Sequence, residues 1–93
     1  MNMQNDGFTK DVMDMGDIAA KWRSFGWDTY EVDGHDINQL ITTLRKTSEE
    51  RPKVIICNTI KGKGVSFMEL NIKFHGGCPT EAEYEAAIKE LSE

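Results

Sequence analysis

The apolar residues in the first third of the chain are spaced first as in a helix and then as in a strand. One helical face is formed by Ile18, Ala19, Trp22 and Phe25. Asp17 places a negative charge at the amino end of this helix, where the helix dipole favours one. Gly26 follows as the residue that ends the helix. Residues 27–32 are rich in aromatic and β-branched side chains, which favours a strand.

A second helix and a second strand are expected after a turn at residues 33–35. Asp36 is a good amino-terminal cap, and the apolar residues after it recur at the spacing of a helical face. These residues are Ile37, Leu40, Ile41 and Leu44. Residues 54–57 form a continuous apolar run, which is typical of a strand buried on both faces. We expect this strand to reach residue 58, with Cys57 as a small buried hydrophobic residue.

The last third of the chain is a long loop followed by a helix. Residues 59–79 show no clear secondary structure, and loops of this length in compact domains tend to be functional or disordered. Thr80 and Glu83 have the spacing of a capping box, which predicts a helix that runs to about Leu91. Residues 1–13 lack periodicity, although the Asn-Asp-Gly segment at 5–7 is a turn signal.

The order helix, strand, helix, strand, loop, helix predicts an α/β fold with a parallel strand pair. Two strands are too few for an independent parallel sheet, which needs both faces covered. We therefore expect residues 1–93 to be a single partial domain, one portion of a larger α/β domain. Exposed sheet edges and faces predict an oligomer or a fold that depends on a partner.

Composition narrows the functional classes. The net charge of −5 over 93 residues argues against a general nucleic-acid binder. No apolar run approaches the length of a membrane span, and the amino terminus shows no apolar signal region, so the cytoplasm is the expected compartment. Two cysteines do not make a disulfide framework.

Candidate chemistry lies in the long loop. Lys61 and Lys63 alternate with Gly62 and Gly64, which can take positive φ, and His75 stands before two further glycines. Cations, exposed amides and an imidazole after a strand suggest a site for an anion such as phosphate. The alternative is a solvated turn, with the histidine holding the loop through a hydrogen bond.

Two metal sites can also be considered. His35 could bind a metal with Asp33 and Asp36, but turn and cap roles already explain these residues. A zinc site would combine both cysteines with both histidines of the chain. Neither cysteine has the paired spacing that zinc sites favour, which argues against it.

Three segments carry a family resemblance. FGWDTYEVDGHD, NTIKGKGVSFME and FHGGCP occur in this order along the chain. Together they resemble the end of the thiamine diphosphate-binding domain of transketolases. The likeness covers nearly the whole chain, from about Asn2 to Leu91. It is closest to the carboxyl-terminal part of the amino-terminal subunit of split, two-gene transketolases.

The resemblance implies thiamine diphosphate and Mg²⁺ as cofactors of a completed assembly. It places His75 at the active site, in contact with the diphosphate and with the hydroxyl end of the substrate, with a proton-transfer role. Lys61, fourteen residues earlier, is expected to face the cofactor. Gly62, Gly64 and Gly76 are expected to shape the loop.

The family's magnesium motif is incomplete in this chain. Aligned with the family, Met1 stands where the metal-binding asparagine is expected, and Met3 stands where a main-chain carbonyl reaches the metal. The implied function is therefore part of a transketolase that moves a two-carbon ketol unit between sugar phosphates and needs other transketolase subunit chains. No nucleic-acid or membrane partner is expected. The alternative is a non-catalytic α/β module that binds a protein or a metabolite.

Overall fold

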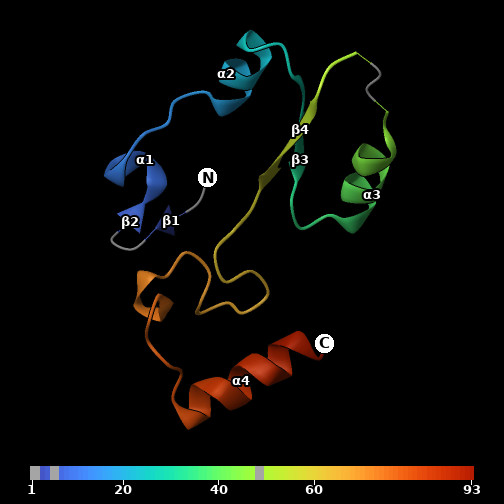
Figure 1. Cartoon of the computed structure of the whole chain (residues 1–93). Coiled ribbons are helices and arrows are strands. Elements are labelled where there is room, and N and C mark those ends of the chain that lie inside the picture. Colours follow the sequence, from blue (N-terminus) through green and yellow to red (C-terminus); the bar gives the residue numbers. More distant parts are fainter. Residues whose placement is uncertain (1–2, 5–6, 48–49) are drawn as a thin grey trace. The chain divides into compact units, whose positions relative to one another are not determined.

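The structure, a computed structural model, describes residues 3–4, 7–47 and 50–93. It confirms an α/β fold in the expected order, preceded by a short hairpin and helix (Figure 1). The elements are β1 (Met3–Gln4), β2 (Gly7–Phe8), α1 (Thr9–Val12), α2 (Ile18–Ser24), β3 (Asp28–Asp33), α3 (Ile37–Arg45), β4 (Lys53–Asn58), the 3-10 helix η1 (Ile72–Phe74) and α4 (Glu81–Leu91).

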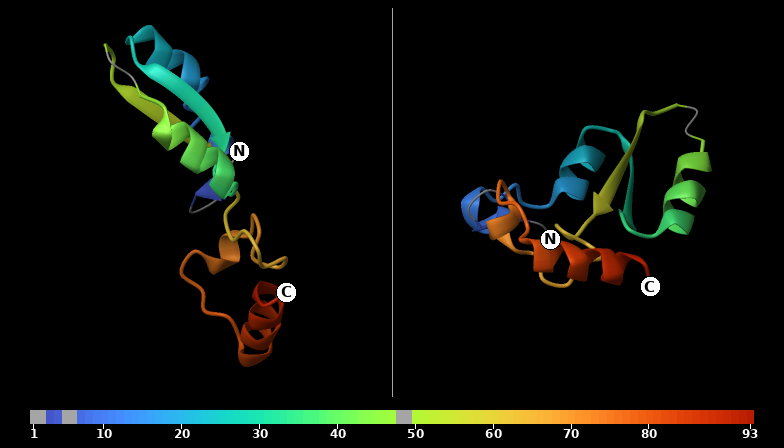
Figure 2. Two further views of the ribbon diagram at one scale, coloured as in Figure 1. Left: turned by 90° about the vertical axis from the view of Figure 1, so that its right-hand side faces the viewer. Right: turned by 90° about the horizontal axis from the view of Figure 1, so that it is seen from below.

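The contacts divide the chain into two compact units, and the expectation of a single partial domain stays a prediction. One unit contains residues 14–59, and the other contains residues 1–13 and 60–93. The unit of residues 14–59 is built on a parallel pair of strands, β3 and β4, whose register runs from Asp28 opposite Lys53 to Asp33 opposite Asn58. Helices α2 and α3 flank this pair (Figures 1 and 2).

The helices of this unit begin and end at residues that the sequence indicates. The side chain of Asp17 accepts a hydrogen bond from the Ala20 amide at 3.0 Å and caps α2. Gly26 follows α2 with φ of +85°, the left-handed conformation expected at a helix end. Asp36 caps α3 by accepting from the Gln39 amide at 3.2 Å.

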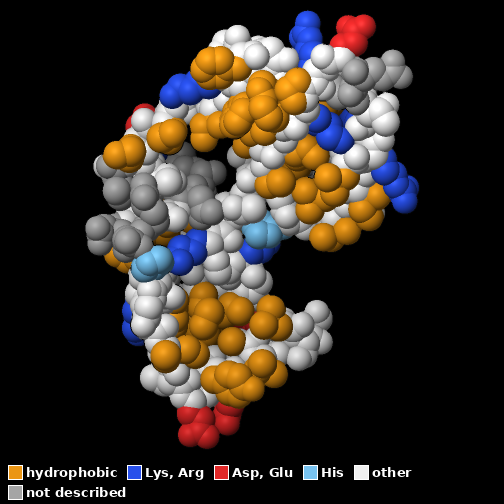
Figure 3. Space-filling view, viewed as in Figure 1, with side chains coloured by type: hydrophobic (Ala, Val, Ile, Leu, Met, Phe, Trp, Pro, Cys, Tyr) orange, Lys and Arg blue, Asp and Glu red, His pale blue; other side chains and the backbone are white. Residues whose placement is uncertain are grey.

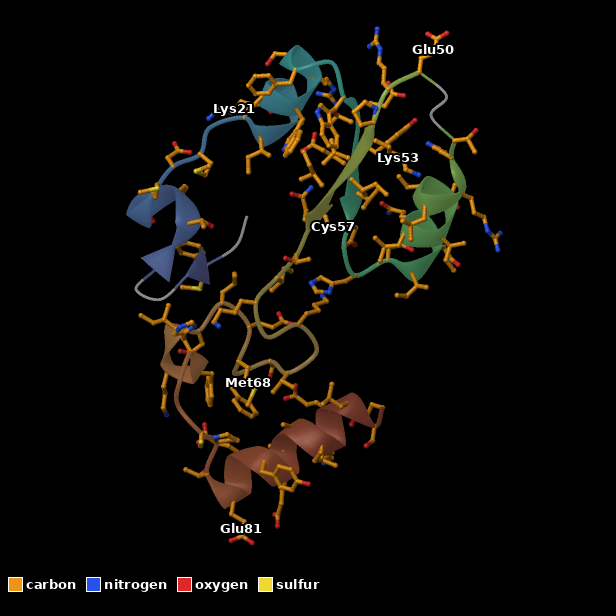
Figure 4. The ribbon with its side chains drawn as sticks, in the orientation of Figure 1. Lys21, Glu50, Lys53, Cys57, Met68 and Glu81 are labelled. Atoms are coloured by element: carbon orange, nitrogen blue, oxygen red, sulfur yellow. The ribbon has the colours of Figure 1, made fainter. Side chains whose placement is uncertain are left out.

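Lys53 closes the carboxyl end of α3 from the first residue of β4 (Figure 4). Its ammonium donates to the carbonyl oxygens of Thr43, Leu44 and Lys46 at 3.1, 2.9 and 2.7 Å. Carbonyls at a helix end have no partner within the helix, and a cation there also interacts favourably with the helix dipole. The side chain therefore joins the crossover helix to the strand that follows it.

The expectation that β4 is buried on both faces is wrong. The first four residues of the strand are half-buried and the last two are exposed, including Cys57. The contacts of α2 and α3 concentrate on β3, so the end of β4 has little cover. Ile37 and Leu44 on the apolar face of α3 are each 64% exposed, and Figure 3 shows hydrophobic side chains gathered at the surface. These surfaces support the predicted need for a partner.

The other unit holds short elements and the last helix. Strands β1 and β2 are antiparallel, with Met3 opposite Phe8. They are too short to show periodicity in the sequence, and the turn predicted at 5–7 depends on residues 5 and 6, which lie outside the described residues. The capping box of α4 is confirmed, since Thr80 and Glu83 each accept a bond from the other's amide. The Thr80 amide first, and then the Thr80 hydroxyl, lower the pKa of the Glu83 carboxyl.

Within the described ranges, a helix with the length and apolar character needed to span a bilayer is absent.

Candidate functional site

The VDGHD segment forms a tight turn after β3. The Gly34 amide donates to the Asn58 carbonyl at 2.8 Å, and a Cβ on Gly34 would lie 2.6 Å from the Thr59 methyl. Only glycine fits such a close approach. Asp33 accepts from the His35 amide at 2.9 Å. The turn role of Asp33 and the cap role of Asp36 are thus confirmed.

After β4, residues 60–70 fold back on themselves as a closed double turn. The Leu70 amide donates to the Lys61 carbonyl at 2.9 Å and joins the two ends of the segment. Gly62 and Gly64 have φ of +77° and +100°, as the motif predicts. A Cβ on Gly62 would also lie 2.6 Å from the Met68 carbonyl carbon. The glycines therefore serve both the turn and the close packing of its two arms.

Several backbone amides of this turn donate to acceptors of the protein itself. Four consecutive N–H groups donate within the unit: Lys63 to the Ile60 carbonyl, Gly64 to the Glu69 carboxylate, Val65 to the Gly62 carbonyl and Ser66 to the Glu90 carboxylate. Of the KGKG segment itself, the amides of Lys63 and Gly64 therefore already satisfy acceptors of the protein, and the expected anion site stays a prediction.

Helix α4 holds the loop through Glu90. One oxygen of its carboxylate accepts from the Ser66 amide at 2.6 Å, and the other accepts from the Ser66 hydroxyl at 2.7 Å. These bonds, the hydroxyl bond first, lower the pKa of Glu90 because they favour the charged form. Buried Val65 and Ala87, from the loop and the helix of this unit, contribute to its small core.

The HG motif follows at the end of η1. Asn71 caps η1 by accepting from the Lys73 amide at 3.0 Å, and its own amide group donates to the Phe67 carbonyl at 3.0 Å. His75 is exposed, and its backbone N–H donates to the Ile72 carbonyl at 3.0 Å. The imidazole therefore stands at the surface of a loop whose backbone is held by hydrogen bonds.

The structure places all three residues of the expected site in one unit. Lys61 is half-buried at the start of the loop, His75 is exposed at its end, and Met3 is half-buried in β1. Sequence reasoning missed Ser66 and Glu90, which hold the loop. No local signal links them, since 24 residues separate them.

The described residues fit the diphosphate-binding part of a metal-diphosphate site better than the metal-binding part. The loop offers a half-buried lysine and an exposed histidine, whose side chains suit a diphosphate. In residues 3–4, 7–47 and 50–93, there is no cluster of three or more His, Cys, Asp or Glu side chains that could hold a metal ion. Met1 and Asn2, near the expected asparagine position, lie outside the described residues.

The family is shown by a match to the transketolase, thiamine diphosphate-binding domain, over residues 2–92. The chain therefore belongs to the transketolase family, and the family recognised from the VDGHD, KGKG and HG motifs is confirmed.

Individual relatives agree with this assignment. The chain is 40% identical over 93 residues to a subunit of the apulose-4-phosphate transketolase of Phocaeicola vulgatus, a match that covers 98% of this chain and 33% of the relative. It is 37% identical over 91 residues to the 6-deoxy-6-sulfo-D-fructose transketolase subunit SqwG of a Clostridium species, covering 96% and 33%. It is 38% identical over 72 residues to human transketolase-like protein 2, covering 75% and 11%. The chain thus spans about a third of the length of the transketolase subunits it matches.

Proposed function

We propose that this chain is part of a thiamine diphosphate-dependent transketolase that transfers a two-carbon ketol unit between sugar phosphates. The observation that carries the proposal is the family match over residues 2–92, together with one hydrogen-bonded loop that bears both Lys61 and His75. Relatives named as transketolase subunits support the need for other chains. Their names also suggest phosphorylated or sulfonated ketoses as donors to try.

Lys61 and His75 have different tasks in this proposal. The Lys61 ammonium contacts the diphosphate of the cofactor and neutralises part of its charge. His75 contacts the diphosphate and the hydroxyl end of the substrate, where an imidazole can donate to an anion or move a proton near neutral pH. When bound, thiamine diphosphate supplies the electron sink for breaking and forming the carbon–carbon bond.

Magnesium belongs to the completed assembly in this proposal. We assign the Met3 main-chain carbonyl as one ligand, and its support is the alignment with the family motif. We assign the side-chain ligands to other segments of the assembly, because the alignment puts Met1 where the metal-binding asparagine is expected. We expect the 93-residue chain alone to show no measurable binding of thiamine diphosphate in calorimetry, even with Mg²⁺.

We also place the assembly in the cytoplasm. Cys57 and Cys78 are free thiols at the surface, and exposed free thiols are compatible with a reducing compartment.

Reconstitution tests the function. The chain is mixed with candidate transketolase subunit chains, thiamine diphosphate and Mg²⁺, and two-carbon transfer from ketose phosphate donors to an aldose phosphate is measured. Mixtures without this chain are the control. Activity that requires the chain supports the proposal. A stable complex with a partner chain and no transfer from any donor would favour the non-catalytic module instead.

Variants of the reconstituted enzyme test the two residues. His75→Ala should lower kcat by roughly ten- to ten-thousand-fold, the range for losing one acid–base or polar contact. Lys61→Ala should instead raise the half-saturating concentration of thiamine diphosphate more than it lowers kcat. His35→Ala is the matched control, because this histidine belongs to the architectural VDGHD turn. Wild-type turnover by His75→Ala would show that His75 is only a structural residue of the loop and takes no part in the reaction.

A further inference from the structure

The segment that carries Lys61 and His75 is held by its own hydrogen bonds as a single body. The Leu70 amide binds the Lys61 carbonyl at 2.9 Å, and the Met68 and Glu69 amides both bind the Val65 carbonyl, at 2.9 and 3.1 Å. This closes residues 61–70 into one structure. A displacement at its centre must therefore reach its ends.

The same network extends to His75. Asn71 joins the double turn to η1, because its side chain binds both the Phe67 carbonyl and the Lys73 amide. The rings of Phe67 and Phe74 also pack, with centroids 5.8 Å apart. The backbone that carries the imidazole is thus connected to the double turn by the Asn71 side chain and by the contact between the Phe67 and Phe74 rings.

One side chain ties this body to helix α4. Glu90 uses both carboxylate oxygens on Ser66, at 2.6 and 2.7 Å. Ser66 lies at the centre of the double turn, between its two hydrogen-bonded arms. The helix also stands close to the turn at Gly64, where an added Cβ would lie 3.2 Å from the Leu91 side chain.

We propose that Glu90 is a positioning residue, which through Ser66 holds the backbone of Lys61 and His75 in one arrangement. In this proposal helix α4 positions the loop of the site, although it supplies no group that contacts a ligand. That the arrangement serves diphosphate binding rests on the proposed function. That Glu90 controls it is a property of the chain and is tested separately.

Amide hydrogen exchange of the folded 93-residue chain tests the proposal. The amides to follow are those of Ser66, Leu70 and His75, which bind Glu90, Lys61 and Ile72 respectively. In Glu90→Ala all three should exchange faster, that of Ser66 by about fivefold or more. Two amides serve as controls and should keep their protection: that of Gly34, which shows that residues 14–59 are folded, and that of Tyr84, which donates to the Thr80 carbonyl at 2.8 Å and shows that α4 is still formed.

Further variants separate positioning from general loss of stability. Glu85→Gln removes an exposed carboxylate from the same helix and should change none of these rates. Ser66→Ala removes the hydroxyl bond and keeps the amide bond, so it should speed exchange at Leu70 and His75 less than Glu90→Ala does, whereas Ser66→Thr keeps the hydroxyl and should show wild-type rates.

The proposal is overturned if only the Ser66 amide responds to Glu90→Ala, because the tie would then be local. It is also overturned if no amide responds, or if Glu85→Gln has the same effect. Failure of the proposed function is a different result, since it is seen as absence of transfer in the reconstituted assembly and leaves these exchange rates unaffected.

Discussion

Replacing Lys53 with methionine should destabilise the unit of residues 14–59 by about 1–2 kcal/mol. Methionine keeps an unbranched side chain of similar length and removes the ammonium. The three carbonyls at the end of α3, 2.7–3.1 Å from that ammonium, then lose their common donor. The variant tests whether a cation from β4 holds the crossover helix in place.

The magnitude follows from competing effects. A hydrogen bond to a charged group contributes about 1.5–3 kcal/mol when it is well formed, and three such bonds would suggest more. Lys53 is only half-buried, so in the variant water can reach the carbonyls and replace some of the hydrogen bonds that the ammonium made. A cation at a helix carboxyl end contributes at most about 2 kcal/mol, which limits the expected loss.

Tryptophan fluorescence during urea unfolding is a suitable assay. Trp22 and Trp27 are the two tryptophans of the chain, both lie in residues 14–59, and their rings are in edge contact with centroids 4.7 Å apart. The unfolding midpoint should fall by roughly 0.3–2 M urea, because small proteins lose about 1–3 kcal/mol of stability per molar urea. Arg51→Met, which removes an exposed charge from the same connection, is the control. Equal midpoints for the two variants would refute the capping role.

Three other outcomes are expected in the unit of residues 1–13 and 60–93. Gly62→Ala should cost about 1–3 kcal/mol of stability, measured by thermal unfolding, because φ is +77° and the added Cβ meets the Met68 carbonyl. Thr80→Ala should lower α4 helicity in circular dichroism and cost about 1 kcal/mol, the usual value of an amino-terminal cap. The Glu90 carboxylate has a lowered pKa in the folded chain, so its bonds to Ser66 stabilise the fold above the ordinary glutamate pKa and are lost as the pH falls through the lowered value. The Ser66 amide resonance should therefore titrate at a pH below the ordinary glutamate range, and titration within or above that range would contradict this.

Short-range chemistry in the sequence was sufficient for α2, β3, α3, β4 and α4, whereas the short elements β1, β2, α1 and η1 were not predicted. Asp17 and Asp36 cap helices because a side-chain oxygen can reach an amide three residues later. Gly62 and Gly64 take positive φ because they have no Cβ. The motif set was also sufficient for the family, since each motif stands in the family's order. These features depend on neighbours in the chain, which a sequence displays directly.

Burial could not be determined in this way. The apolar run of β4 and the stripe of α3 correctly indicate a strand and a helix, yet Cys57 and much of the stripe are exposed. Spacing shows which side chains share a face. It does not show what covers that face, because cover comes from other elements or other chains.

Each unit contains long-range hydrogen bonds that only the tertiary structure reveals. Lys53 reaches three carbonyls seven to ten residues earlier, and Glu90 reaches Ser66 across 24 residues. In the sequence each is an ordinary charged residue that would be assigned to the solvated surface. Their roles exist only because folding brings an ammonium to the end of α3, and a carboxylate to the amide and hydroxyl of Ser66.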